Sequence, residues 1–574
     1  MKLNIQIFMV FILCYFVAGC SDAPKIEANV HPESIQFSGD KALDYVTNFV
    51  GRFPNRNSGE PNNKKAAEWL ESEFNRLGLS TTTDHWDIVN YSKDVPMQNV
   101  VGKISGESEK EIIIVAHFDQ SPDTYEGADN DGSGMAILMQ LADIFSQENK
   151  PKYTLVFLAA DGEEYGMLGT LRYVQTYPNT NQILAGLSLD NVGKELYNGL
   201  RMDPRGQFRN YGALWFQLLA QEAARAIHDE WVPKMNPVII QLLDQAVPVS
   251  FMDEGPMVAV GIPSFGLAGA TPPEFAQLHW DTYHSPRDLI KYQSAETLGH
   301  TGRVSEAIIR QCLAMDSFPA ESGPYLYFEK SGEVFRGLPL WVIFMAVVLS
   351  FFLVAYFIGS KNDHCLFTHW QAPLIHFLSL WLPLIGAVIL TYILVAVGMM
   401  DTYHLYPGTS KDAVIYTPIW SAVIIWILGL AFLFWACRKL SAKYLASFES
   451  PTQSQMKQFG FFIIGFGSIY LLVINPFSLV FIPPVFVWSC INDRKEGSKY
   501  SDILIFAFGG LFIYALIYFF GFVIMKNDLA ILWYLMMMFS ICMVSFPTSM
   551  MIMAVIASGL GMVVSPNKNV NANT

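Results

Sequence analysis

Three acid-rich blocks, each at the end of a short apolar run, constrain the fold of this chain more than any other feature. The blocks are AHFDQ at residues 116–120, AADGEEYG at 159–166 and LSLDN at 187–191. The apolar runs before them cover residues 111–115, 153–158 and 184–189 and are too short for helices. We therefore predict three buried strands, whose carboxyl ends deliver His117, Asp119, Glu163, Glu164 and Asp190.

A fourth block, GADNDGSG at residues 127–134, opens a helical pattern that runs to Phe145 and leads into the second strand. Strand, helix and strand in this order form the crossover of an α/β sheet, and such sheets place their sites beyond the carboxyl ends of the strands. The predicted fold class is α/β, with a mixed, largely parallel sheet flanked by helices. The acids of the blocks are expected to meet at one end of that sheet.

Weaker patterns complete the prediction for this part of the chain. Helical spacing occurs at residues 41–50, 66–77, 214–227 and 295–315. Further strands are expected at residues 99–104, as an edge strand, and at 249–252 and 262–267. A polar loop at residues 279–290 carries His279 and His284.

Composition divides the chain in two. Most charged residues and all the motifs lie in the first 325 of its 574 residues, whereas Phe, Leu, Ile, Met and Trp dominate the rest. We predict a soluble domain at residues 40–325 and an α-helical transmembrane bundle at 326–574. The formal net charge of −14 provides no basic surface and argues against nucleic acid as a partner.

The first 20 residues are typical of a secretory signal. Lys2 precedes an apolar core at residues 7–17 that is short for a membrane span. The ending VAGC resembles the bacterial lipobox, which would make Cys20 a lipidated residue; a simple signal anchor is the alternative. Residues 21–39 are then expected to be a tether.

Apolar stretches in the second half predict seven or eight transmembrane helices. They cover residues 338–359, 373–397, 413–436, 459–474, 477–491, 503–525 and 529–564, the last with Pro547 as a dividing point. Basic residues such as Lys361, Arg438 and Arg494 fall in alternate loops, so the positive-inside rule predicts that those loops are cytoplasmic. We expect a multi-pass protein of the bacterial inner membrane, in contact with lipids, whose soluble domain faces the periplasm or the cell exterior.

Histidine and carboxylates that converge at strand ends suit a divalent ion such as zinc, which takes imidazole nitrogen and carboxylate oxygen. Glu163 and Glu164 are adjacent, so one can bind metal while the other acts as a general base. A single HxD or EE pair is common on protein surfaces. Four such blocks in order, each after a strand, indicate a metal centre.

Together these motifs resemble metallopeptidase family twenty-eight, the co-catalytic zinc exopeptidases that include bacterial leucyl aminopeptidase. The resemblance covers roughly residues 40 to 315 and includes a YHSPRD loop at 283–288. It implies the zinc exopeptidase fold and two zinc ions. His117 and Asp190 would hold one ion, and Glu164 and His284 would hold the other.

The same resemblance implies that Asp119 orients His117 and that Glu163 is the general base. His279 lies outside the family pattern and is expected at the surface or at the rim of the substrate site. The order of a soluble peptidase domain before a multi-span region also looks like the endoplasmic reticulum metallopeptidases.

One position departs from the family. The aspartate that bridges the two zinc ions is replaced by Asn130, between Asp129 and Asp131. Two neighbouring cations need an anionic bridge, and an amide is neutral. Three alternatives follow: Asp129 or Asp131 replaces the bridge, one ion is weak or lost, or the site is degenerate.

The predicted function is a membrane-anchored, zinc-dependent exopeptidase, of aminopeptidase type, that hydrolyses N-terminal residues of peptides. A binding or assembly protein with an impaired peptidase fold is one alternative, because of Asn130. A transporter with an extracytoplasmic sensor domain is another, because of the large membrane half. The sequence leaves the oligomeric state open.

Overall fold

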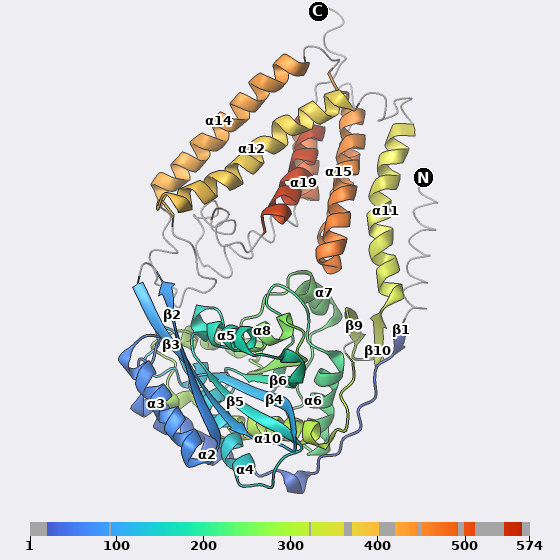
Figure 1. Cartoon of the computed structure of the whole chain (residues 1–574). Helices are drawn as coiled ribbons and strands as arrows, with labels where there is room; N and C mark the ends of the chain where they lie inside the picture. Colours follow the sequence, from blue (N-terminus) through green and yellow to red (C-terminus); the bar gives the residue numbers. More distant parts are fainter. Residues whose placement is uncertain are drawn as a thin grey trace, which may run out of the picture. The chain divides into compact units, whose positions relative to one another are not determined.

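The computed structural model describes residues 20–90, 93–320, 323–360, 370–400, 419–445, 450–491, 499–510, 536 and 545–564. The chain divides into two compact units. The first continues to Leu340, beyond the expected boundary at residue 325, and the second begins at Trp341. Figure 1 shows the helices and strands of both units.

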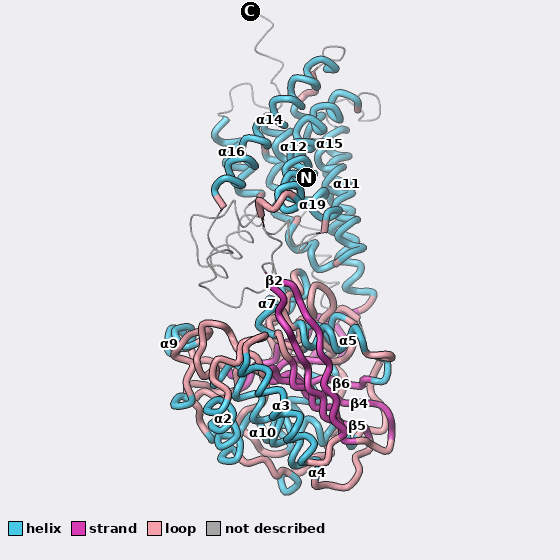
Figure 2. Tube along the Cα trace, turned by 60° about the vertical axis from the view of Figure 1, so that its left-hand side comes forward, coloured by secondary structure: helices cyan, strands magenta, loops and turns pink. Residues whose placement is uncertain are grey.

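A seven-stranded mixed sheet is the centre of the first unit (Figure 2). Its order is β2-β3-β5-β4-β6-β8-β7, and the four central strands are parallel. The strands are β2 (Ser80–Asn90), β3 (Lys93–Ile104), β4 (Ser108–His117), β5 (Tyr153–Ala160), β6 (Ile183–Leu189), β7 (Leu200–Asp203) and β8 (Ser264–Gly269). The predicted mixed, largely parallel α/β sheet is confirmed.

Helices cover both faces of the sheet, which explains why its central strands are continuous apolar runs. On one face, Ile112 and Ile114 of β4 pack into a core with α2 (Gly39–Arg52), α3 (Pro61–Arg76), α4 (Gly134–Ser146), α6 (Leu214–Ala226) and α10 (Ala295–Ala314). On the other face, Ile113 and Val115 pack with side chains of α5 (Leu168–Thr176) and α8 (Glu254–Ala259). Successive residues of a strand point to opposite faces, so both sets are buried.

Two strand predictions are wrong. Residues 99–104 are not an edge strand, because β3 pairs with β5 on one side and with β2 on the other. The sequence of β2, STTTDHWDIVN, has few apolar residues, since this outer strand is largely exposed to solvent, and it was therefore not predicted. Residues 249–252 form no strand and instead precede helix α8.

A small second sheet lies within the first unit. Its strands β1 (Cys20–Asp22), β10 (Glu333–Arg336) and β9 (Tyr325–Phe328) are antiparallel. The backbone N–H groups of Gln36 and Phe37 donate to Glu306 of α10. The segment expected to be a tether is therefore held against the domain at both its ends.

The remaining elements of this unit are short. They are the helices α7 (Val238–Ala246) and α9 (Ala276–Thr282), a π-helical turn η2 (Ala128–Ser133), and the 3₁₀ turns η1 (Pro32–Ser34), η3 (Glu163–Tyr165), η4 (Thr180–Gln182), η5 (Pro273–Phe275) and η6 (Ile290–Tyr292). Turns η2, directly before α4, and η3, shortly after β5, carry candidate site residues.

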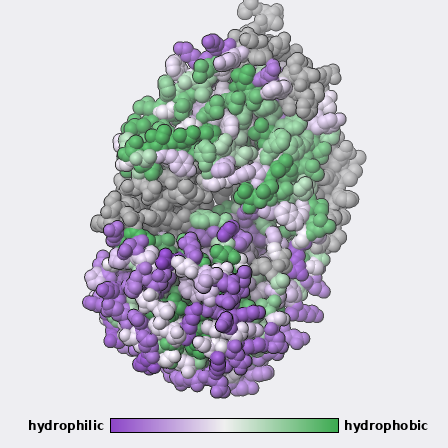
Figure 3. Space-filling view, in the orientation of Figure 1, coloured by the Kyte–Doolittle hydropathy of each residue, from purple (hydrophilic) through white to green (hydrophobic). Residues whose placement is uncertain are grey.

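The described part of the second unit is helical. Among the described residues, five helices are long and apolar enough to cross a membrane, and the first of them starts at the end of the first unit. These are α11 (Leu338–Ser360), α12 (Gln371–Ala396), α14 (Trp420–Leu445), α15 (Gln453–Ile474) and α19 (Phe546–Val564). They expose apolar side chains such as Leu428, Phe432 and Val473, whereas the surface of the sheet domain is largely hydrophilic (Figure 3). Such apolar surfaces are typical of helices that face lipid.

One predicted span takes a different form. Residues 477–491 are covered by two 3₁₀ segments, η8 (Pro476–Phe481) and η9 (Pro483–Cys490), rather than by one long helix. Proline lacks a backbone N–H and disrupts a continuous helix. Pro483 and Pro484 lie in this stretch, and Pro476 directly precedes it. Residues 503–525 are described only to 510, where α16 (Lys499–Gly509) ends.

Several predictions fall outside the described residues. They concern the signal sequence before Cys20, the loops with Lys361 and Arg494, the stretch 511–525, and most of residues 529–544. The count of seven or eight transmembrane helices therefore stays a prediction.

Candidate active site

The register of the parallel strands brings the predicted residues to one end of the sheet. His117 is the last residue of β4 and pairs with Ala160, the last residue of β5. On its other side β4 pairs with β6, which ends at Leu189, next to Asp190. The carboxyl ends of parallel strands meet at one edge, so residues far apart in the sequence become neighbours.

His117 lies at the centre of this group and is almost completely buried. Its Nε2 atom is 3.7 Å from Oε2 of Glu163 and 3.8 Å from Oδ1 of Asp190. On the other side of the site, Nε2 of His284 is 3.1 Å from Oε1 of Glu164. The five residues predicted as ligands or base therefore form two adjacent groups, one around His117 and one around His284.

Asn130 lies between these two groups. Its Oδ1 atom is 2.9 Å from Nε2 of His117. Its Nδ2 atom is 2.8 Å from Oε1 of Glu164 and 2.8 Å from Nε2 of His284. The side chain thus occupies the bridging position that the sequence motif indicates, with an amide in place of a carboxylate.

The carboxylate of Asp119 contacts both the ring of His117 and the backbone of the Glu163–Glu164 turn. Its carboxylate lies 3.2 Å from Nδ1 of His117 and accepts from the backbone N–H groups of Glu163 and Glu164, each at 3.2 Å. It is fully buried. A bond to the second ring nitrogen fixes the orientation of an imidazole that can bind metal through the first.

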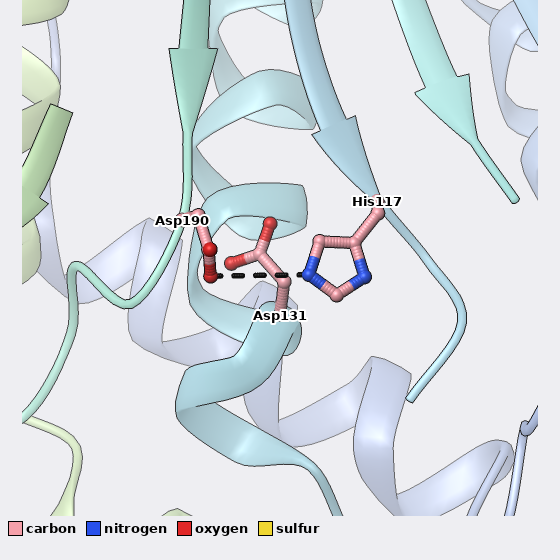
Figure 4. Close-up of side chains that lie close together, drawn as sticks. All are labelled: His117, Asp131 and Asp190. Carbon is pink, nitrogen blue, oxygen red and sulfur yellow. Dashed lines mark ion pairs between the residues drawn. The ribbon is translucent and has the colours of Figure 1, made fainter. Parts of the chain in front are cut away.

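The residues around His117 fit a metal ion. His117, Asp131 and Asp190 each offer a donor atom, and these atoms lie within 4.8 Å of one another. Figure 4 shows the Asp131 carboxylate between Asp190 and His117. Its Oδ2 atom is buried and has no hydrogen-bond partner among the described residues. An unpaired buried carboxylate oxygen is costly unless a cation binds it.

Asp129 is committed to other partners. Its Oδ1 atom accepts from the backbone N–H of Gly193 at 2.9 Å, and its Oδ2 atom accepts from the hydroxyl of Tyr197 at 2.5 Å. Nζ of Lys194 lies 3.3 Å from the same Oδ2 atom. Asp129 is thus unsuited to replace the missing bridge.

Asp288 of the YHSPRD loop couples that loop to Asn130. Its carboxylate accepts from the backbone N–H groups of Asp129 and Asn130, each at 3.1 Å. Burial raises the pKa of Asp288 to about 6, in spite of the nearby Lys194. This contact fixes the loop that carries His284 against the segment that carries Asn130.

Sequence reasoning missed two buried supports in the loop at residues 53–60, between α2 and α3. Arg56 is fully buried and donates to the carbonyl oxygens of Phe118, Glu126 and Gly127 and to the side chain of Gln120. It braces the loop between β4 and η2. Burial lowers its pKa to about 10, so it stays charged at neutral pH.

Ser58 is the second support, because its hydroxyl lies between two carboxylates. It is 2.6 Å from Oδ1 of Asp161 and 3.3 Å from Oδ2 of Asp119. The backbone N–H of Gln98 donates to the other oxygen of Asp161. Burial, followed by the charge of Asp119, raises the pKa of Asp161 to about 7. No signal in the sequence distinguishes Arg56 and Ser58 from ordinary loop residues, because their partners are distant in the chain.

The electrostatics of the site favour protonation of Glu163. Burial raises the pKa of Glu163 well above its ordinary value; His117 opposes this shift, and Glu164 adds to it. For His117, burial alone lowers the pKa, but Glu163 and the hydrogen bond to Asp119 raise it well above its ordinary value. Glu163 and His284 are the more exposed members of the site.

His279 is half-buried rather than a surface residue. Its ring lies 5.8 Å from the ring of Tyr283 and 6.0 Å from that of Tyr197. Burial lowers its pKa to about 4. Tyr283 in turn stacks on His284, with ring centroids 3.9 Å apart. His279 therefore belongs to an aromatic cluster that supports His284.

Residues 99–309 match the family model Peptidase family M28. The family resemblance expected from the motifs is confirmed for this segment, which is less than half of the chain. The matched segment extends from β3 to α10 and contains every candidate metal ligand and the candidate base.

Curated relatives of this chain carry protease names. It is 24% identical over 364 residues to "Vacuolar membrane protease" of Kluyveromyces lactis, which covers 59% of this chain and 36% of that protein. It is 32% identical over 160 residues to "Probable zinc metalloprotease" of Pyrenophora teres f. teres, which covers 24% of this chain and 34% of that protein. The chain spans about a third of the length of these relatives.

Two solved structures are similar to about half of this chain. A zinc aminopeptidase from Bacillus subtilis is 15% identical, with a TM-score of 0.42, and the match covers 48% of this chain and 96% of that one. Porphyromonas gingivalis glutaminyl cyclase is 19% identical, also with a TM-score of 0.42, and the match covers 48% and 99% of the two chains.

Proposed function

We propose that this protein is a membrane-anchored, zinc-dependent exopeptidase of aminopeptidase type. One observation carries the proposal: Glu163, a buried carboxylate with a raised pKa, lies beside the metal-ligand group of His117 and Asp190 within the M28 segment. A buried general base next to a metal centre is the arrangement that hydrolases use.

His117, Asp131 and Asp190 are the residues that would hold the ion. Zinc, when bound, supplies a Lewis acid that polarises a carbonyl group and lowers the pKa of water. Glu163 would accept a proton from the attacking water and return it to the leaving amine. Burial raises the pKa of Glu163 above its ordinary value, and a carboxyl group that holds its proton more tightly is better suited to accept one and then return it.

The membrane half is proposed to anchor the domain, with lipids as its surroundings. Arg438 and Lys443 lie near the C-terminal end of α14 rather than in a loop, and the positive-inside rule predicts that this end is cytoplasmic. The peptidase domain would then face the periplasm or the cell exterior of a bacterium. Lipidation of Cys20 would add a second anchor on that side.

Hydrolysis by the purified full chain tests this proposal. In detergent and with added zinc, the protein should release N-terminal residues from a panel of unblocked peptides, but not from the same peptides with acetylated N-termini. Cleavage inside both sets would show an endopeptidase. No release from any peptide would refute the activity.

A binding or assembly protein is the second candidate, and the amide of Asn130 at the bridging position favours it. Such a protein would bind peptides and leave them intact. Peptide binding without turnover, measured with the same panel, would support this alternative.

A further inference from the structure

The side-chain amide of Asn130 has two chemically different ends, an oxygen and an NH₂ group. A carboxylate has two acceptor oxygens and can bind a cation at each, whereas an amide has one acceptor end and one donor end. Asn130 directs its oxygen toward His117, and its nitrogen toward Glu164 and His284. Only one of the two groups therefore receives an oxygen from this residue.

The orientation of the amide follows from its partners. Ionised Glu164 is only an acceptor, so an oxygen of Asn130 at 2.8 Å from Oε1 would repel it, whereas an NH₂ group donates to it. The NH₂ group also reaches Nε2 of His284. One amide thus satisfies both residues that would otherwise hold a second ion.

Asp131 adds a carboxylate oxygen, a possible metal ligand, to the group around His117. Its Oδ1 atom accepts from the backbone N–H of Gly134 at 2.8 Å, and this bond leaves Oδ2 without a partner among the described residues. A side chain at position 134 would collide with the carboxylate, because its Cβ would lie 2.3 Å from Oδ2. The glycine therefore permits the position of Asp131 beside His117 and Asp190 shown in Figure 4.

We propose that this site binds a single divalent ion, held by His117, Asp131, Asp190 and the oxygen of Asn130, and that the NH₂ group of Asn130 occupies Glu164 and His284 in place of a second ion. Asp131 takes the role of the anionic ligand that the amide has lost. This inference refines the metal content of the proposed exopeptidase, but the metal count does not depend on activity.

Metal titration of the full chain in detergent tests it. After removal of metal with a chelator, zinc binding is measured by calorimetry, and the bound metal is counted by elemental analysis after gel filtration. Wild type should bind one ion, and Asn130→Asp should bind two, since a carboxylate offers an oxygen to both groups.

Single variants separate the two groups. Asp131→Asn keeps an oxygen for the Gly134 N–H and should weaken the one ion by at least ~10-fold. His284→Ala should leave the affinity of that ion unchanged in wild type, but should remove the second ion from Asn130→Asp. His85→Ala, at an exposed position of β2, is the matched control.

Two results would overturn the proposal: two tightly bound ions in wild type, or loss of the single ion in His284→Ala. If Asp131→Asn fails to fold, His284→Ala in the wild-type background and in the Asn130→Asp background still tests the proposal. One bound ion without peptide hydrolysis would refute the proposed function but not this inference. Two bound ions with peptide hydrolysis would refute this inference but not the proposed function.

Discussion

Lys194 places its ammonium nitrogen 3.3 Å from Oδ2 of Asp129, and both side chains are completely buried. Asp129 directly precedes Asn130, so this ion pair fixes the backbone from which the bridging amide projects. Tyr197 and Gly193 supply the hydrogen bonds that such a pair needs in a low-dielectric interior. The pair is a structural support of the site and supplies none of the proposed metal ligands.

We predict that Lys194→Met destabilises the first unit by about 3–5 kcal/mol, because it leaves the charge of Asp129 buried and unpaired. Lys194→Met with Asp129→Asn should recover much of this loss, since neither charge remains. Thermal unfolding of the detergent-purified chain checks the prediction. Equal destabilisation in the single and double variants would show that packing, rather than charge, is what Lys194 provides.

Glu163→Gln should lower peptide hydrolysis by at least ~10²-fold, because an amide cannot accept a proton from water. The metal content should not change, since Glu163 is not among the proposed ligands. Steady-state rates and elemental analysis on the same samples check both statements. Glu195→Gln, at an exposed position, should retain the wild-type rate; a fully active Glu163→Gln would remove Glu163 from the mechanism.

Asp119→Asn should weaken zinc binding by about 10- to 100-fold, because the amide end would face N–H donors and His117 would lose its orientation. Ser58→Ala should have a much smaller effect, since the bond between Asp119 and His117 remains. Competition with a coloured chelator measures both affinities. A larger effect of Ser58→Ala than of Asp119→Asn would contradict this order.

The pKa of Asp161, raised to about 7 by burial, predicts a pH dependence of stability. Between its unfolded value of about 3.9 and about 7, the folded state binds more protons than the unfolded state, so Asp161 makes the protein less stable as pH rises through this range. The amide in Asp161→Asn has no proton to lose in this range. The melting temperature of this variant should therefore fall less than that of wild type between pH 4.5 and 7.5.

The comparison is made on metal-free protein, with Asp94→Asn at an exposed position of β3 as the control. Identical pH profiles for wild type and Asp161→Asn would show that Asp161 keeps an ordinary pKa in the folded state.

The sequence predicted the central strands and the end of the sheet at which the site lies. Runs such as residues 111–115 are apolar throughout because both faces of a parallel sheet are buried, and this pattern is local in the chain. The residues that follow each run, His117 and Asp190 among them, were identified for the same reason. Strand β2 was missed because an outer strand needs no apolar run.

Other features depended on the tertiary structure. The sequence left Asp129 and Asp131 as equal replacements for the missing bridge, but Lys194 and Tyr197 occupy the first, and only the second keeps an unpaired oxygen beside His117. Arg56, buried beneath the loop after β4, gave no sequence signal.

The physical reason is the distance along the chain between the residues that each interaction involves. Burial of a strand is reflected in the residues of that strand, so the sequence by itself determined the buried central strands β4, β5 and β6 and the order of the site residues that follow them. The hydrogen bonds of a buried polar group can come from partners that are distant in the chain: Gly193 and Tyr197, which donate to Asp129, lie 64 and 68 residues away from it. Only the folded chain decides which partner each one receives, and so which way the amide of Asn130 points.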